Sequence, residues 1–135
     1  MRLTPFLLLG SVFVVMAACG CSKEERRGPP VYEVTGQVTV NGTPIKDGAI
    51  QFTSPEDMFH GSEASAMINE GRYTALVTEG KKKVMIWDPE PVGPADSTGS
   101  QRRMETLPPK FNVQSTLECE VAPDDTNEVS FSLKK

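Results

Sequence analysis

Apolar and polar residues alternate along most of the chain after residue 30, and each alternating run ends at a cluster of turn residues. In the first run, four apolar side chains fall on one face, namely Tyr32, Val34, Val38 and Val40. A period of two residues is typical of a half-buried β-strand, because successive side chains point to opposite faces of the sheet. No apolar stripe with the period of an α-helix extends over ten residues or more. The alternation therefore predicts an all-β chain.

Turn sequences divide this alternation into about seven short strands. We predict strands over 32–40, 49–53, 64–68, 72–77, 82–87, 115–121 and 127–133. Asn41-Gly42 and Asn69-Glu70-Gly71 predict tight turns, because Asn and Gly take positive φ angles at little cost. Short strands separated by turns predict one domain with the architecture of an antiparallel β-sandwich.

Two stretches lack the alternation. Residues 55–62 predict a loop, and residues 88–109 predict a longer one with five prolines and two glycines. Loops longer than about 12 to 15 residues are uncommon in compact domains and are either functional or disordered, and this composition favours disorder. If the long loop is functional, Trp87, Arg102 and Arg103 are the candidate surface-binding residues, although Trp87 also fits a core position.

Residues 1–18 have the features of an export signal. Arg2 precedes an apolar run over 6–16, and two alanines follow that run. The run is too short to cross about 30 Å of hydrocarbon as a stable helix. We therefore expect a cleaved signal peptide and a mature protein outside the cytoplasm.

The sequence Met16-Ala17-Ala18-Cys19 resembles a bacterial lipobox, in which the leader is cut before a cysteine that carries fatty acyl chains such as palmitate. We expect Cys19 to be the acylated residue, with Cys21 or an ordinary secretory signal as the alternatives. Acyl chains would hold the protein on a membrane without a spanning segment. The third cysteine, Cys119, falls on the apolar face of a predicted strand and is expected to fill the core.

The chain thus divides into a signal peptide (1–18), a lipidated cysteine with a polar, proline-ended tether (19–30) and one β-sandwich domain (31–135). The net charge of −4 argues against a nucleic-acid partner, because phosphate binding needs clustered Lys and Arg. Three lysines at 81–83 are expected to protect a strand edge from aggregation, with contact to anionic lipid or polysaccharide as the alternative.

The chain has a single histidine, His60. A zinc site with several His ligands cannot be assembled from it, and any Ser-His-Asp arrangement would have to use this residue. The acidic pairs Glu56-Asp57 and Asp124-Asp125 lack the pattern of an EF-hand calcium loop, and turn chemistry explains them. We therefore expect no metal, no cofactor and no catalytic residue, and we expect His60 to be an exposed loop residue.

Several motifs of the predicted strands and turns point to one family. Val34-Thr35-Gly36-Gln37-Val38, Asn41-Gly42-Thr43-Pro44 and Gly48-Ala49-Ile50-Gln51-Phe52 resemble segments of the small carboxypeptidase regulatory-like, or transthyretin-like, lipoproteins of planctomycete bacteria. The resemblance covers residues 31–135 and implies an antiparallel Ig-like/transthyretin-like (prealbumin-like) β-sandwich. It does not imply catalysis, because catalytic carboxypeptidases hold zinc with two His and a Glu, and this chain looks like the accessory domain alone.

Together, these observations predict a non-catalytic, lipid-anchored β-sandwich module of the bacterial cell envelope that takes part in protein–protein or structural interactions. The expected partners are the membrane, through the lipid anchor, and an envelope protein or polysaccharide. The alternative function is binding of carbohydrate or a cell-surface polymer through Trp87. A third hypothesis, an unrecognised hydrolase, would need a cleft that joins His60 to two carboxylates.

Overall fold

A computed structural model describes residues 28–124 and 126–135 of the chain. The strands are β1 (Val31–Val40), β2 (Thr43–Pro44), β3 (Asp47–Thr53), β4 (Ala64–Asn69), β5 (Arg72–Thr78), β6 (Gly80–Trp87), β7 (Pro89–Val92), β8 (Arg102–Glu105), β9 (Leu117–Val121), β10 (Thr126–Glu128) and β11 (Phe131–Leu133). A short helix, α1 (Pro55–His60), follows β3, and a 3-10 turn, η1 (Pro109–Phe111), follows β8. The predicted signal peptide, Cys19 and Cys21 lie outside the described residues.

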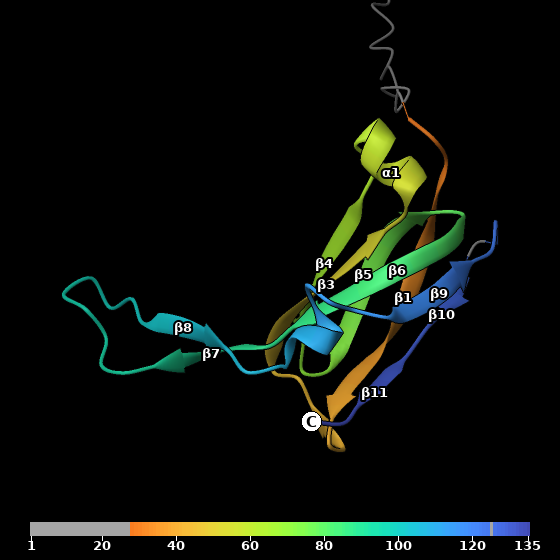
Figure 1. Cartoon of the computed structure of the whole chain (residues 1–135). Coiled ribbons are helices and arrows are strands. Elements are labelled where there is room, and N and C mark those ends of the chain that lie inside the picture. The colour runs from red at the N-terminus through yellow and green to blue at the C-terminus, as the bar shows by residue number, and fades with distance from the viewer. Residues whose placement is uncertain (1–27, 125) are drawn as a thin grey trace, which may run out of the picture.

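Most strands form one curled sheet in the order β10-β1-β5-β4-β3-β6-β9, and β2 and β11 also pair with β1. Strands β4 and β5 share one pair of facing residues, Asn69 and Arg72, next to the turn that joins them. Beyond this pair the two strands separate, and the sheet folds back on itself (Figure 1). One layer contains β3, β4, β6 and β9, and the other contains β1, β5, β10 and β11. The prediction of an all-β, sandwich-like chain is confirmed.

The C-terminal segment departs from the predicted antiparallel arrangement. Where the alternation predicts one strand over 127–133, the structure has β10 and β11, which both pair with β1 in parallel. Between them, the Val129 amide donates to the Thr35 carbonyl at 2.8 Å, and the Val129 carbonyl accepts from the Tyr73 hydroxyl at 2.5 Å. Local alternation carries no information about the direction of a neighbouring strand, because the path of the chain from β9 back to β1 sets it.

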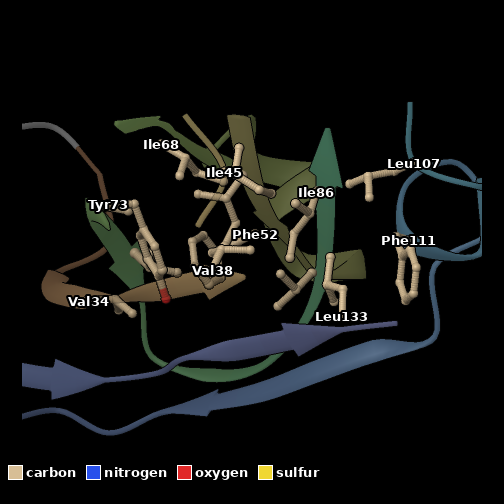
Figure 2. Packing of buried hydrophobic residues seen from close by; sticks show 14 of the residues in the cluster. Val34, Val38, Ile45, Phe52, Ile68, Tyr73, Ile86, Leu107, Phe111 and Leu133 are labelled. Carbon is tan, nitrogen blue, oxygen red and sulfur yellow. The ribbon is translucent and has the colours of Figure 1, made fainter. Parts of the chain in front are cut away.

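The core lies between the two layers (Figure 2). Its members include Val34, Val38, Ile50, Phe52, Ile68, Tyr73, Ala75, Val77, Val84 and Ile86, all of them buried. Phe52 and Tyr73 belong to opposite layers, and their ring centroids lie 5.9 Å apart, a separation typical of aromatic pairs. Cys119 is half-buried and packs against this core, as predicted.

The two predicted turns are present and use positive φ angles. Asn41 and Gly42 have φ angles of 50° and 83°, and Glu70 and Gly71 have 49° and 78°. A Cβ atom on Gly71 would also lie 2.6 Å from the Cβ of Pro44, so this position needs glycine for space as well as for its backbone angle.

The predicted loop over 55–62 is wrong in its first part, because α1 occupies it. Ser54 caps the helix by accepting a hydrogen bond from the Asp57 amide, Pro55 stands in the first turn, and Gly61 ends the helix with φ 65°. Ser, then Pro, then two acidic residues is a helix-start signal in the sequence. Only two apolar residues, Met58 and Phe59, follow in α1, and two residues are too few to show the period of a helix.

The segment over 88–109 is likewise built differently from the expected disordered loop. It forms the antiparallel pair β7–β8 and then η1. The three lysines at 81–83 do not protect an edge, because β6 lies between β3 and β9. Instead, Lys81 pairs with Glu118 at 3.0 Å on the surface, and Lys82 is buried.

Candidate functional site

The pair β7–β8 projects from the body as a separate two-stranded ribbon, which we call the hairpin (Figure 1). It follows directly after Trp87 at the end of β6. All four residues of β8 are exposed, and the apolar side chain of Met104 is 54% exposed. Among the described residues, the hairpin pairs with no other strand, so neither of its two outer edges, one on β7 and one on β8, is paired.

The two edges of the hairpin differ in what they can donate. Pro89 and Pro91 of β7 face Glu105 and Arg103 of β8. Because proline has no N–H, these facing pairs are the non-hydrogen-bonded pairs of the ladder. In such pairs the backbone groups point away from the partner strand, so β7 has an outer edge with two missing donors. Arg103 and Glu105 keep their outward N–H and C=O groups, and β8 is therefore the edge that can accept another strand.

Arg103 fixes the base of the hairpin to the body. Its guanidinium lies 2.9 Å from the Asp47 carboxylate and donates to the carbonyls of Asp47 at 3.2 Å and Pro89 at 2.5 Å. Arg103 is therefore a clamp between β3, β7 and β8, its side chain is 42% exposed, and its role in surface binding stays a prediction. Arg102 is exposed on β8 and faces Val92 in register.

Asp96 orders the tip of the hairpin. Its carboxylate accepts hydrogen bonds from the amides of Thr98 and Ser100 at 2.8 and 3.0 Å. A hydrogen bond from the Thr98 hydroxyl, together with these two amide bonds, lowers the pKa of Asp96. The tip is thus a compact turn held by side-chain to backbone bonds.

A pocket of about 630 Å³ lies at the base of the hairpin, between it and the β1–β2 turn. Its charged lining includes Lys46, Asp47, Asp88, Arg103 and Lys135. Burial is the main cause that raises the pKa of Asp88, with a smaller contribution from neighbouring carboxylates. The pocket carries both signs of charge beside the exposed backbone of the hairpin.

Trp87 is half-buried at the end of β6. In the sheet register, Ala49 faces Trp87 on one side and Met67 on the other, so the three side chains form a row across β6, β3 and β4. Met67 is 60% exposed at the end of this row. Trp87 is therefore part of an apolar row on the outer face of the sheet, with its side chain half-buried.

A second polar region lies at the other end of β6, beside α1. Asp57 and Lys82 are both buried, and Lys82 Nζ lies 2.5 Å from Asp57 Oδ2. The carboxylate also accepts hydrogen bonds from the hydroxyls of Thr78, Ser54 and Ser62 at 2.6, 2.8 and 3.0 Å. We call these five residues the Asp57 cluster. Burial alone would raise the pKa of Asp57, but the hydrogen bonds from the lysine and the three hydroxyls outweigh it and lower the pKa to about 2.

The geometry of the Asp57 cluster holds α1 on the sheet. Lys82 Nζ donates to Asp57, to the Thr78 hydroxyl at 2.6 Å and to the Ser54 hydroxyl at 3.4 Å, so its three hydrogens are all engaged. The Ser54 hydroxyl donates its hydrogen to Asp57 at 2.8 Å and not to Lys82, as a serine-lysine catalytic pair would require. His60 lines the adjacent pocket of about 250 Å³, but it is exposed, and its ring stacks edge-on against Phe59.

Sequence reasoning missed the Asp57 cluster, although one signal was available. Lys82 shares its parity with Val84 and Ile86, the two residues that β6 buries in the core. A lysine at an inward position of a strand predicts a buried acidic partner, because an unpaired charge is costly to bury.

Within the described residues, no group of three or more His, Cys, Asp or Glu side chains is arranged to hold a metal ion. No helix in that part of the chain is long and apolar enough to cross a membrane.

No family model matches the chain, and no curated protein matches it. Among solved structures, it is similar to a DUF3823 family protein from Parabacteroides merdae, with a TM-score of 0.41 and 11% identity over 79% of this chain and 46% of that one. It is also similar to a 9R-lipoxygenase from Cyanothece, with a TM-score of 0.41 and 9% identity over 78% of this chain and 16% of that one. The chain spans less than half the length of either protein.

Proposed function

We propose that the protein is a non-catalytic, lipid-anchored module of the bacterial cell envelope that binds another protein through the hairpin β7–β8. The observation that carries this proposal is the outer edge of β8. That edge projects from the body, keeps its backbone donors and acceptors, and pairs with no strand among the described residues.

The binding mode that fits this edge is strand addition. An extended segment of the partner pairs its backbone with Arg103 and Glu105, while the exposed Met104 and Arg102 side chains select the sequence that binds. The clamp formed by Arg103 and the turn formed by Asp96 hold the hairpin in shape before binding, which reduces the entropy lost on association.

Two observations favour a protein partner over carbohydrate. Trp87 is half-buried in a row with Ala49 and Met67, and sugar binding uses an aromatic face that is open to solvent. The hairpin offers unpaired backbone groups, which an extended polypeptide satisfies along its whole length.

The positions of Lys82 and His60 support the non-catalytic part of the proposal. Lys82 Nζ is hydrogen-bonded to Asp57 and Thr78 inside the Asp57 cluster, and the His60 ring lies edge-on to Phe59 at the surface. Neither group is placed as a base beside a free hydroxyl, which acyl transfer requires.

The protein part of the proposal is tested by capture from envelope extract. The full-length protein should retain a partner, and Met104→Asp, which places a charge in the proposed contact, should abolish retention. Val113→Asp is the matched control, because Val113 is an exposed apolar residue, 69% accessible, outside the hairpin. Retention that survives Met104→Asp, or that Val113→Asp abolishes equally, would exclude the hairpin as the binding site.

The anchor is tested separately by metabolic labelling with a fatty acid. We expect Cys19→Ala to remove the label and Cys21→Ala to keep it. Removal of the label by Cys21→Ala alone would move the anchor to that residue. Label that neither substitution removes would overturn the lipoprotein assignment.

A further inference from the structure

Helix α1 presents two adjacent apolar side chains to solvent. Met58 is 65% exposed and Phe59 is 85% exposed, the largest exposure among the large apolar residues that the structure describes. Asp57, the residue before them, is buried in the Asp57 cluster. Because each residue of a helix turns by about 100°, fixing Asp57 inward directs Met58 and Phe59 outward.

These two side chains lie at the end of the molecule where the described chain begins. Pro29 and Pro30 line the same pocket as Glu56 and His60 of α1. Figure 1 shows α1 and the start of β1 at one end of the body, while the hairpin leaves from the region where β6 ends. The eight residues of β6 separate the two regions by roughly 23 Å.

The distance from α1 to the lipid attachment point is short. Eight residues lie between Cys19 and Gly28, and the nine steps from one Cα atom to the next span at most about 32 Å. If Cys19 is acylated, as the proposed function states, Gly28 is held within this distance of the lipid surface, and the next two residues, Pro29 and Pro30, line the pocket beside α1. A weak apolar contact is sufficient there, because the tether makes the contact intramolecular.

We propose that the Met58–Phe59 tip of α1 docks into the interface of the membrane that carries the lipid anchor. In the docked orientation, the hairpin leaves the body roughly 23 Å of strand away from the docked tip. Two carboxylates, Glu56 and Glu79, line the pocket beside α1 and would be repelled by anionic headgroups. The tip is therefore suited to zwitterionic lipid, and apolar insertion drives the contact.

The test is photo-crosslinking in the full-length chain, with Phe59 replaced by p-benzoylphenylalanine, which keeps an aromatic ring at that site. Irradiated envelope membranes should yield lipid adducts at position 59. They should be about tenfold more abundant than at position 113 carrying the same residue, because interfacial helices bury their apolar face to a depth of several ångströms. Met58→Glu in the same chain should strongly reduce the lipid adducts.

Each other outcome overturns the proposal in a distinguishable way. Protein adducts at position 59 would make α1 a protein-binding surface. An absence of adducts at position 59, with the chain still in the membrane fraction, would exclude docking and leave the anchor intact. Loss of the chain from the membrane fraction would overturn the anchor and docking with it.

Discussion

Lys82 Nζ lies 2.5 Å from Asp57 Oδ2, and the two side chains expose only 3% and 4% of their surface. The pair joins α1 to the core-facing side of β6. Two charges leave water here, and the hydroxyls of Thr78, Ser54 and Ser62 replace part of the hydration of the carboxylate. A buried pair of this kind adds little net stability, but it is costly to break.

Lys82→Met should destabilise the domain by about 3 to 5 kcal/mol, because it leaves the Asp57 carboxylate buried without a counter-charge. Urea denaturation measures the loss, and Lys83→Met, on the exposed side of the same strand, should change the free energy of unfolding by less than about 0.5 kcal/mol. The double variant Lys82→Met/Asp57→Leu should recover part of the loss. Equal effects of Lys82→Met and Lys83→Met would show that the pair is not needed to hold α1.

Acid should weaken the domain through Asp57. The pKa of this carboxyl is about 2 in the folded chain against an ordinary value of 3.8, so unfolding takes up a proton between these two pH values. The stabilisation, roughly 2 kcal/mol, is fully present above about pH 4 and is lost as the pH falls toward 2. Unfolding free energies measured from pH 2 to pH 6 should fall less steeply in Asp57→Asn. Identical slopes in the two proteins would contradict this assignment.

Gly36→Ala should destabilise the domain by about 3 kcal/mol or more. A Cβ atom at this position would lie 1.7 Å from the Val129 carbonyl oxygen, which also accepts from the buried Tyr73 hydroxyl and cannot move away without breaking that bond. Urea denaturation measures the loss. Gly28→Ala is the matched control, because a Cβ there meets nothing within 4 Å, and its effect should be near zero. A tolerated Gly36→Ala would show that the C-terminal strands do not lie against β1 as described.

The same glycine shows what local pattern can and cannot predict. The alternation around Gly36 predicts β1 and its buried face correctly, since burial on one face needs only a period of two. The reason for glycine at that position lies in Val129, 93 residues later, and no local pattern reports on that contact. For the same reason, the parallel pairing of β10 and β11 could not be predicted.

The candidate site was harder to predict than the core because its signals are exceptions to local rules. By themselves, prolines at 89 and 91 predict a loop. They are nevertheless compatible with an edge strand, because the backbone N–H groups that they lack would point away from the partner strand. The run of three lysines that includes Lys82 predicts a surface position for it. The alternation of β6, however, places Lys82 on the same side of the strand as the core residues Val84 and Ile86. The role of Trp87, Arg102 and Arg103 in surface binding stays a prediction, and only the structure assigns Arg103 its contacts to Asp47 and Pro89.

Cys119 should react slowly with alkylating reagents. Burial raises the pKa of its thiol to about 11 from 9.0, and the charge of Lys82, which faces it across β6 and β9, offsets only part of the effect. In a chain carrying Cys19→Ser and Cys21→Ser, the alkylation rate at pH 8 should be about a hundredfold lower in the folded protein than in denaturant. Equal rates would place this thiol outside the core.

Arg103→Ala should release the hairpin while leaving the body folded. The substitution removes the ion pair to Asp47 and the hydrogen bond to the Pro89 carbonyl, which together fix the base of the hairpin. Because Arg103 and Asp47 are about half exposed, the cost in global stability should stay within about 1 kcal/mol. Hydrogen exchange of the Arg102 and Met104 amides, which face β7, should instead become about tenfold faster, because opening of the hairpin no longer has to break the clamp.

Arg102→Ala is the control for the Arg103 experiment, because Arg102 stands on the same strand and faces Val92 across the ladder. It should leave both exchange and stability unchanged. Partner capture should fall in Arg103→Ala if a preformed edge is what binds, since the partner must then supply the ordering energy that the clamp supplied before. Unchanged exchange in Arg103→Ala would mean that the β7–β8 ladder and the Asp96 turn alone hold the hairpin, and that Arg103 is free to contact the partner directly.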